Sequence, residues 1–182
     1  MIFAIAGYLV LVDYGSAPGQ PARAPQRWPA SSSLPLAAGV PTLLMIIHPR
    51  CACTRASIAE LARLMVPLDG RVRAFAVLAL PGGATDEWRE TDLWRSVARI
   101  PGITVFADEG AEEADRFGAR TSGQVLLYDE AGALRFAGGI TPGRSHQGDS
   151  DGRRRILDLV GAPAGSGVSA VYGCALHAGE DP

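Results

Sequence analysis

The chain has 182 residues, of which 47% are hydrophobic and 20% are charged, and its formal net charge is −2. This composition allows one globular domain with additional segments, and the absence of a polybasic region argues against nucleic acid as a partner. All seventeen basic residues are arginine. A chain without lysine excludes Schiff-base chemistry and a phosphate-binding P-loop.

The first fourteen residues contain an apolar stretch, Ile2 to Val12. A membrane-spanning helix needs ~20 apolar residues, but an apolar N-terminus ahead of a spacer is typical of a signal-anchor. We therefore expect residues 1–14 to hold the chain at a membrane, with the domain on the periplasmic or extracytoplasmic face. An N-terminus recorded too short would explain why no basic residue precedes Arg23. The alternative for this stretch is a strand of the core.

Residues 15–40 are rich in proline, alanine, serine and glycine. Proline-rich segments of this kind form extended spacers that do not pack as regular structure. We predict an exposed linker here.

The stretch on which the function depends follows directly after this linker. An apolar run at 43–47 ends at His48, two cysteines follow at Cys51 and Cys53, and the pattern then changes to helical spacing. The apolar residues of that helical face are Ile58, Leu61, Ala62 and Met65. The pattern predicts a strand, a turn that carries the cysteines, and a helix.

A thiol at the start of a helix has a lowered pKa, because unpaired backbone N–H groups and the helix dipole stabilise the thiolate. Arg50 and Arg55 add positive charge, and His48 lies three residues before Cys51. We therefore predict a stabilised thiolate at this turn, with His48 and Arg50 tuning it. A disulfide between residues two apart is strained and therefore easily reduced.

The remaining elements complete an α/β domain over residues 41–161, followed by a glycine- and alanine-rich tail over 162–182 that carries Cys174 and His177. We expect a central mixed sheet flanked by helices. The predicted strands are 72–80, 103–106, 124–128 and 134–137, and the predicted helices are 85–99, 112–117 and 151–160.

A strand that leads through cysteines into a helix resembles the thioredoxin-like superfamily, whose first strand ends in Cys-x-x-Cys. When Glu60-Leu61 is placed on the Glu-Leu common in that helix, Cys51 matches the first cysteine of the family, and Thr54 takes the place of the second. Cys53 then lies between them, and the resemblance implies that Cys51 is the attacking thiol and that Cys53 resolves. The run HPRCACTRAS, the run FAGGIT at 136–141 and a late Gly-Cys are similar to the RedB-type branch of these proteins.

This resemblance implies a thioredoxin-like fold and a thiol–disulfide oxidoreductase that needs no cofactor and acts on protein thiols and disulfides. The family has a cis-proline six residues before the aspartate that matches Asp129, and here that position is Gly123. The resemblance places this loop opposite the cysteines. Substrate contacts are accordingly expected from Arg50, Thr54, Ser122 and Gly123.

Two alternatives use the same residues. His48, Cys51 and Cys53 are soft ligands suited to copper, so the chain is also interpreted as a copper-binding, chaperone-like protein. A fourth ligand would come from His146, Cys174 or His177. The second alternative is a non-catalytic thioredoxin-fold interaction module, because Cys-x-x-Cys and the cis-proline are both missing.

Overall fold

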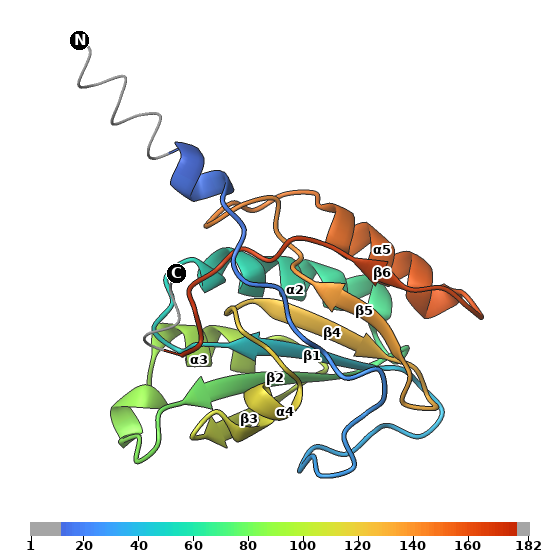
Figure 1. Cartoon of the computed structure of the whole chain (residues 1–182), viewed down its shortest axis with the longest axis horizontal. Helices are drawn as coiled ribbons and strands as arrows, with labels where there is room; N and C mark the ends of the chain where they lie inside the picture. The colour runs from blue at the N-terminus through green and yellow to red at the C-terminus, as the bar shows by residue number, and fades with distance from the viewer. Residues whose placement is uncertain (1–11, 178–182) are drawn as a thin grey trace.

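The computed structural model describes residues 12–177. Its strands and helices follow the predicted order, with one further short strand near the C-terminal end (Figure 1). The strands are β1 (Thr42–Ile47), β2 (Arg73–Leu80), β3 (Ile103–Glu109), β4 (Gln124–Tyr128), β5 (Leu134–Gly138) and β6 (Gly167–Val168). The helices are α2 (Thr54–Leu68), α3 (Asp92–Ala98), α4 (Glu112–Arg116) and α5 (Asp151–Gly161), with a 3₁₀ turn at Asp86–Trp88.

The six strands form one mixed sheet in the order β3-β2-β1-β4-β5-β6. β1, β2 and β3 are parallel, whereas β4 runs antiparallel to β1 and to β5. β1 therefore lies inside the sheet, and all six of its residues are buried. This burial explains why its sequence is continuously apolar instead of alternating. The fold prediction of an α/β domain with a mixed sheet is confirmed.

Two apolar layers cover the two faces of the sheet. One joins the sheet to α2, α3 and α5 through residues such as Leu61, Val97 and Ile156. The other lies against α4 and the N-terminal segment and includes Leu34, Phe117 and Tyr128. The helix that begins at the cysteines is thus fixed on the more heavily covered face.

The helix predicted over 85–99 is divided in two. The 3₁₀ turn ends at Trp88, and α3 starts only after Thr91, whose hydroxyl accepts a hydrogen bond from the Trp94 amide at 3.2 Å. A threonine that satisfies an open N–H group of the first turn starts a new helix.

Residues 17–40 are not the exposed spacer that their proline content predicts, because they pack across the face covered by α4 (Figure 1). The amide of Trp28 donates to the Gly132 carbonyl at 2.7 Å, and the Trp28 ring lies 4.9 Å from that of Phe117 and 5.3 Å from that of Tyr128. Leu34 is 3% exposed. Prolines permit this path because an extended segment on a sheet face needs few N–H donors of its own.

The predicted signal-anchor falls largely outside the described residues. Residues 12–16 are helical, and nothing is described before them. Within residues 12–177, none of the helices is both long enough and apolar enough to span a bilayer.

The segment after α5 also belongs to the folded domain, whereas sequence reasoning ended the domain at 161. β6 pairs with β5 in parallel, and the isolated bridge between Thr121 and Ala175 joins the segment to the loop before β4. Figure 1 shows this segment (red) running toward the end of the molecule at which β1 ends. It thereby brings Cys174 to the start of α2.

Candidate functional site

The turn between β1 and α2 carries the first two cysteines. The Cys51 amide donates to the His48 carbonyl at 3.1 Å, and the Thr54 amide donates to the Cys51 carbonyl at 3.1 Å. Cys53 is the N-cap residue of α2 and has helical backbone angles, but its side chain makes no capping hydrogen bond. The turn therefore places both thiols at the positive end of the helix.

The third cysteine completes a cluster that sequence spacing alone did not indicate. The sulfur atoms of Cys51 and Cys174 are 2.7 Å apart, and the Cys174 amide donates to the Cys51 sulfur at 3.4 Å. All three sulfur atoms, including that of Cys53, lie within 4.8 Å of one another. Cys51 is 1% exposed, whereas Cys53 and Cys174 are partly exposed.

The loop before β4 holds Cys174 in this position. The Ser122 amide donates to the Cys174 carbonyl at 2.9 Å, and the Leu176 amide donates to the Arg120 carbonyl at 2.9 Å. Gly173 approaches so closely that a Cβ atom there would lie 1.9 Å from the Ser122 carbonyl oxygen. This position therefore requires glycine, and the backbone on both sides of Cys174 is fixed by the loop.

The thiols of Cys51 and Cys174 differ in pKa because their surroundings differ. Burial raises the pKa of Cys51, but hydrogen bonds from Cys174 and Thr54, through side chains and backbone amides, lower it by more, so it lies below its usual value. Burial and the adjoining sulfur of Cys51 raise the pKa of Cys174 to about 12. The charge of a thiolate is therefore best accommodated on Cys51.

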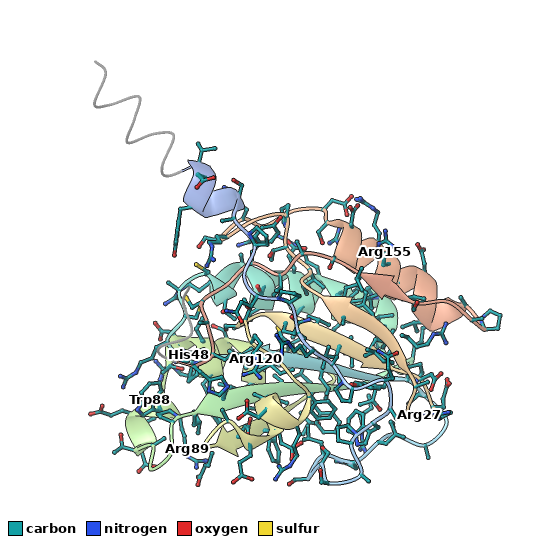
Figure 2. All side chains as sticks on the ribbon, in the orientation of Figure 1. Arg27, His48, Trp88, Arg89, Arg120 and Arg155 are labelled. Carbon is teal, nitrogen blue, oxygen red and sulfur yellow. The ribbon has the colours of Figure 1, made fainter. Side chains whose placement is uncertain are left out.

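The side chains of His48 and Arg50 make contacts with Trp88 and Glu87. The Arg50 guanidinium lies 3.8 Å from the centre of the Trp88 ring and 3.8 Å from Glu87, and the His48 ring packs edge-on against Trp88. Figure 2 shows His48 and Trp88 at the same end of the molecule. Burial and the Arg50 charge lower the pKa of His48, so its ring is neutral at neutral pH. The hydrogen bonds that lower the Cys51 pKa come from Thr54 and Cys174 instead.

Thr54 and Ser122 meet directly beside the cysteines, as the resemblance implied for this loop. Their hydroxyl oxygens are 2.7 Å apart, and Ser122 also accepts a hydrogen bond from the His48 amide at 2.8 Å. Gly123, the next residue of the loop, lies against α2 at Ser57, since a Cβ atom on Gly123 would be 2.8 Å from the Ser57 hydroxyl. Ser122 is thus the loop residue that contacts both the turn and the Cys174 segment.

Proline does not suit position 123 in this structure. Gly123 has a φ of 90° and donates its amide hydrogen to the Ile46 carbonyl at 2.8 Å. Proline has neither that φ nor an amide hydrogen. The proline that the family has at this position would therefore lose this hydrogen bond and require another backbone conformation.

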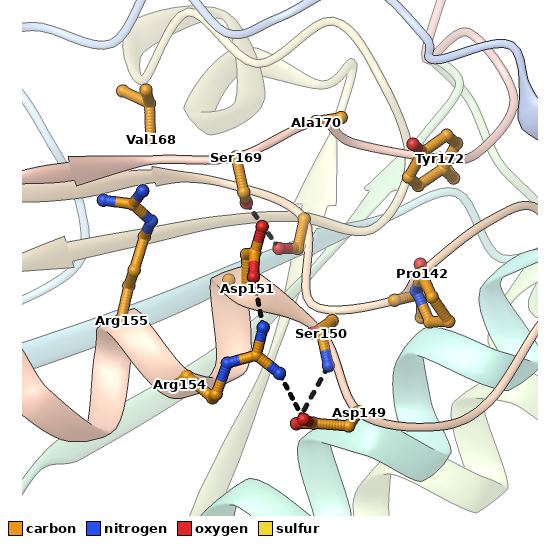
Figure 3. A pocket seen from close by; sticks show the side chains of 13 residues that line it. Pro142, Asp149, Ser150, Asp151, Arg154, Arg155, Val168, Ser169, Ala170 and Tyr172 are labelled. Atoms are coloured by element: carbon orange, nitrogen blue, oxygen red, sulfur yellow. Dashed lines mark hydrogen bonds and ion pairs between the residues drawn. The ribbon is translucent and has the colours of Figure 1, made fainter.

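The loop before α5 lines a pocket of about 330 Å³ that does not contain the cysteines (Figure 3). Three of its charged groups are engaged with each other, since Arg154 pairs with Asp149 and Asp151. Its other wall is the C-terminal segment, where the Ser169 hydroxyl donates to the Gly139 carbonyl at 2.7 Å. This hydrogen bond therefore ties the C-terminal segment, which carries Cys174, to the chain just after β5.

Comparison with known proteins gives a likeness of fold. No protein-family model matches the sequence, and none of the curated proteins matches it. An uncharacterized conserved protein from Geobacillus kaustophilus superimposes with a TM-score of 0.62 and 16% identity over 92% of this chain and 94% of its own. A hypothetical protein from Sinorhizobium meliloti superimposes with a TM-score of 0.60 and 20% identity over 88% of this chain and 93% of its own. The "putative Thiol:disulfide interchange protein DsbE" from Chlorobium tepidum superimposes with a TM-score of 0.50 and 17% identity over 80% of this chain and 99% of its own.

Proposed function

Because this chain has a thioredoxin-like fold, we propose that it is a thiol–disulfide oxidoreductase that exchanges electrons with protein dithiols and disulfides. The observation that supports this most directly is the cluster of three cysteine sulfurs within 4.8 Å at the turn between β1 and α2. Disulfide exchange needs two thiols within bonding reach and a stabilised thiolate, and this cluster has both.

In the direction that reduces a substrate, a thiolate of the cluster attacks one sulfur of the substrate disulfide. That bond breaks, a mixed disulfide forms, and the first substrate thiolate takes a proton from water. A second thiol of the cluster then loses its proton and attacks the mixed disulfide, which releases the second substrate thiolate. Two electrons pass from two cysteines to one substrate disulfide, and oxidation of a dithiol follows the same steps in reverse.

The proposal is tested by mixing the reduced full-length protein with a peptide that contains a single disulfide. We expect the chain to lose two thiols for each peptide disulfide reduced, faster than free glutathione reacts at the same thiol concentration. Mass spectrometry of both partners measures this ratio. A rate no higher than that of glutathione would rule out the proposed activity.

A second candidate function is binding of copper as Cu(I), and the sulfur cluster favours it. The group supported here differs from the predicted set of His48, Cys51 and Cys53, and the His48 Nδ1 accepts the Arg50 amide at 3.2 Å. Among the described residues, the group that could hold a metal is Cys51, Cys53 and Cys174. Three sulfur ligands suit Cu(I), whereas structural zinc sites almost always have four protein ligands.

Titrating the anaerobic reduced protein with Cu(I) against a chromogenic chelator tests this candidate. We expect one Cu(I) per chain, with a loss of affinity on the order of tenfold or more in Cys174→Ser, because a ligand is removed. His48→Ala should bind Cu(I) as the unaltered chain does. An equal loss of Cu(I) affinity in both variants would indicate that His48 is one of the ligands.

We also infer that the domain works outside the cytoplasm, attached through residues 1–14. The support is the apolar N-terminal sequence that precedes the domain. Fractionation of cells that express the full-length chain should recover it with membranes, and carbonate washing should leave it there. Recovery in the soluble cytoplasmic fraction would contradict this localisation.

A further inference from the structure

We propose that Cys174, not Cys53, is the redox partner of Cys51, and that Cys174 is the sulfur that exchanges with the substrate. This inference rests on the proposed oxidoreductase function and names the residues that perform it. It replaces the predicted pairing of Cys51 with Cys53.

Contact geometry favours the distant cysteine over the near one. The Cys51 and Cys174 sulfurs are 2.7 Å apart although 123 positions separate them in sequence. Cys53 has helical backbone angles, with φ at −62° and ψ at −28°. The Cys53 sulfur also lies within 4.8 Å of the Cys51 sulfur, but a disulfide between residues two apart is strained, whereas Cys51 and Cys174 already touch.

The position of Cys174 is set by several independent contacts. Its amide points at the Cys51 sulfur, and its carbonyl accepts the Ser122 amide. The bridge between Thr121 and Ala175 and the close approach of Gly173 fix the residues on either side. A thiol held in place in this way needs little rearrangement to form the bond, which favours an intramolecular disulfide.

Burial assigns the two sulfurs different tasks. Cys51 is 1% exposed, because the segment around Cys174 lies over it, whereas Cys174 is itself partly exposed. An incoming substrate thiolate therefore reaches the Cys174 sulfur more easily than the Cys51 sulfur. Cys51 is in turn surrounded by hydrogen-bond donors from Thr54 and Cys174, which suit a departing thiolate.

Oxidation of a substrate dithiol then proceeds in two exchanges. The first substrate thiolate attacks Cys174, the Cys51–Cys174 bond breaks, and Cys51 leaves as a thiolate while a substrate–Cys174 disulfide forms. The second substrate thiolate attacks the substrate sulfur of that mixed disulfide and releases Cys174, which takes up a proton. The substrate loses two electrons, which the two cysteines gain, and two protons, of which Cys174 takes one and water takes the other because Cys51 stays a thiolate.

Disulfide mapping of the oxidised full-length protein tests the pairing without any variant. Peptides containing Cys51 and Cys174 should be joined, with Cys53 free. Oxidation of the Cys53→Ser variant should likewise consume two thiols. In Cys174→Ser the rate of disulfide exchange should fall on the order of 100-fold or more. Val168→Ser, a change at a side chain 73% exposed in the same segment, is the matched control and should keep the wild-type rate.

Two results would overturn the inference. A map that joins Cys51 to Cys53 while the unaltered protein still exchanges disulfides would refute the pairing and leave the oxidoreductase function intact. Absence of both exchange and any intramolecular disulfide would remove the function together with the pairing. The exchanging sulfur is identified separately, because a single-cysteine peptide should be recovered on Cys174 of the oxidised protein, and recovery on Cys51 would contradict that assignment.

Discussion

Replacing Cys51 by serine is expected to lower the rate of disulfide exchange on the order of 1,000-fold, to the rate of the uncatalysed thiol reaction. Cys51 is the member of the cluster whose pKa is lowered, and its sulfur contacts Cys174 directly. Serine keeps the size of the side chain but cannot form the disulfide. The peptide-disulfide assay measures this loss.

The appropriate control for Cys51→Ser is Ser57→Ala, because Ser57 is buried on the same helix and carries no thiol. Circular dichroism and the urea midpoint show whether each variant is folded. If Cys51→Ser retains more than about a tenth of the wild-type rate while folded, the reaction does not depend on the Cys51 sulfur, and Cys53 with Cys174 would be the remaining pair.

Replacing Glu60 by alanine is expected to cost about 2–4 kcal/mol of unfolding free energy, which is the largest stability effect that we anticipate for a charged residue here. The Glu60 carboxylate is fully buried and accepts a hydrogen bond from the Gly148 amide at 2.8 Å. It also pairs with Arg63 and, at 3.3 Å, with Arg153 of α5. The value lies below that of a fully buried pair because both arginines are partly exposed.

Urea denaturation of Glu60→Ala and Glu60→Gln separates the two contributions, since glutamine keeps an acceptor for the Gly148 amide but removes the charge. Glutamine should therefore lose less stability than alanine. Glu112→Ala is the matched control, because that carboxylate pairs with Arg116 at 2.9 Å while 67% exposed, and exposed pairs contribute little. Equal losses in Glu60→Ala and Glu112→Ala would show that burial does not strengthen the Glu60 contacts.

The sheet and most helices were predictable because their signals are local. β1 and β2 are continuous apolar runs, and α5 combines helical spacing with a serine cap, Ser150, whose hydroxyl accepts from the Arg153 amide. Such patterns depend only on neighbours within a few residues. The position of Cys51 at the start of α2 could be predicted for the same reason.

The proline-rich segment and Cys174 could not be placed in this way. Composition made residues 15–40 an exposed linker, and only the tertiary structure shows Trp28 packed between Phe117 and Tyr128. The contact between Cys51 and Cys174 depends on the loop before β4, which no sequence spacing reveals. A late Gly-Cys was the single available signal, and its resemblance to the RedB-type branch stays a prediction.

The wide separation of Cys51 and Cys174 has a mechanical consequence once they are joined. The 123 positions between them correspond to roughly 440 Å of extended chain, none of which would lengthen if the oxidised molecule were pulled by its ends. β1 lies outside this covalent loop, whereas its sheet neighbours β2 and β4 lie inside it. Force on the oxidised molecule would therefore act on the contacts of residues 17–40 and on the hydrogen bonds of β1, while β2 and β4 stay held inside the loop, so the oxidised and reduced molecules would yield to force in a different order.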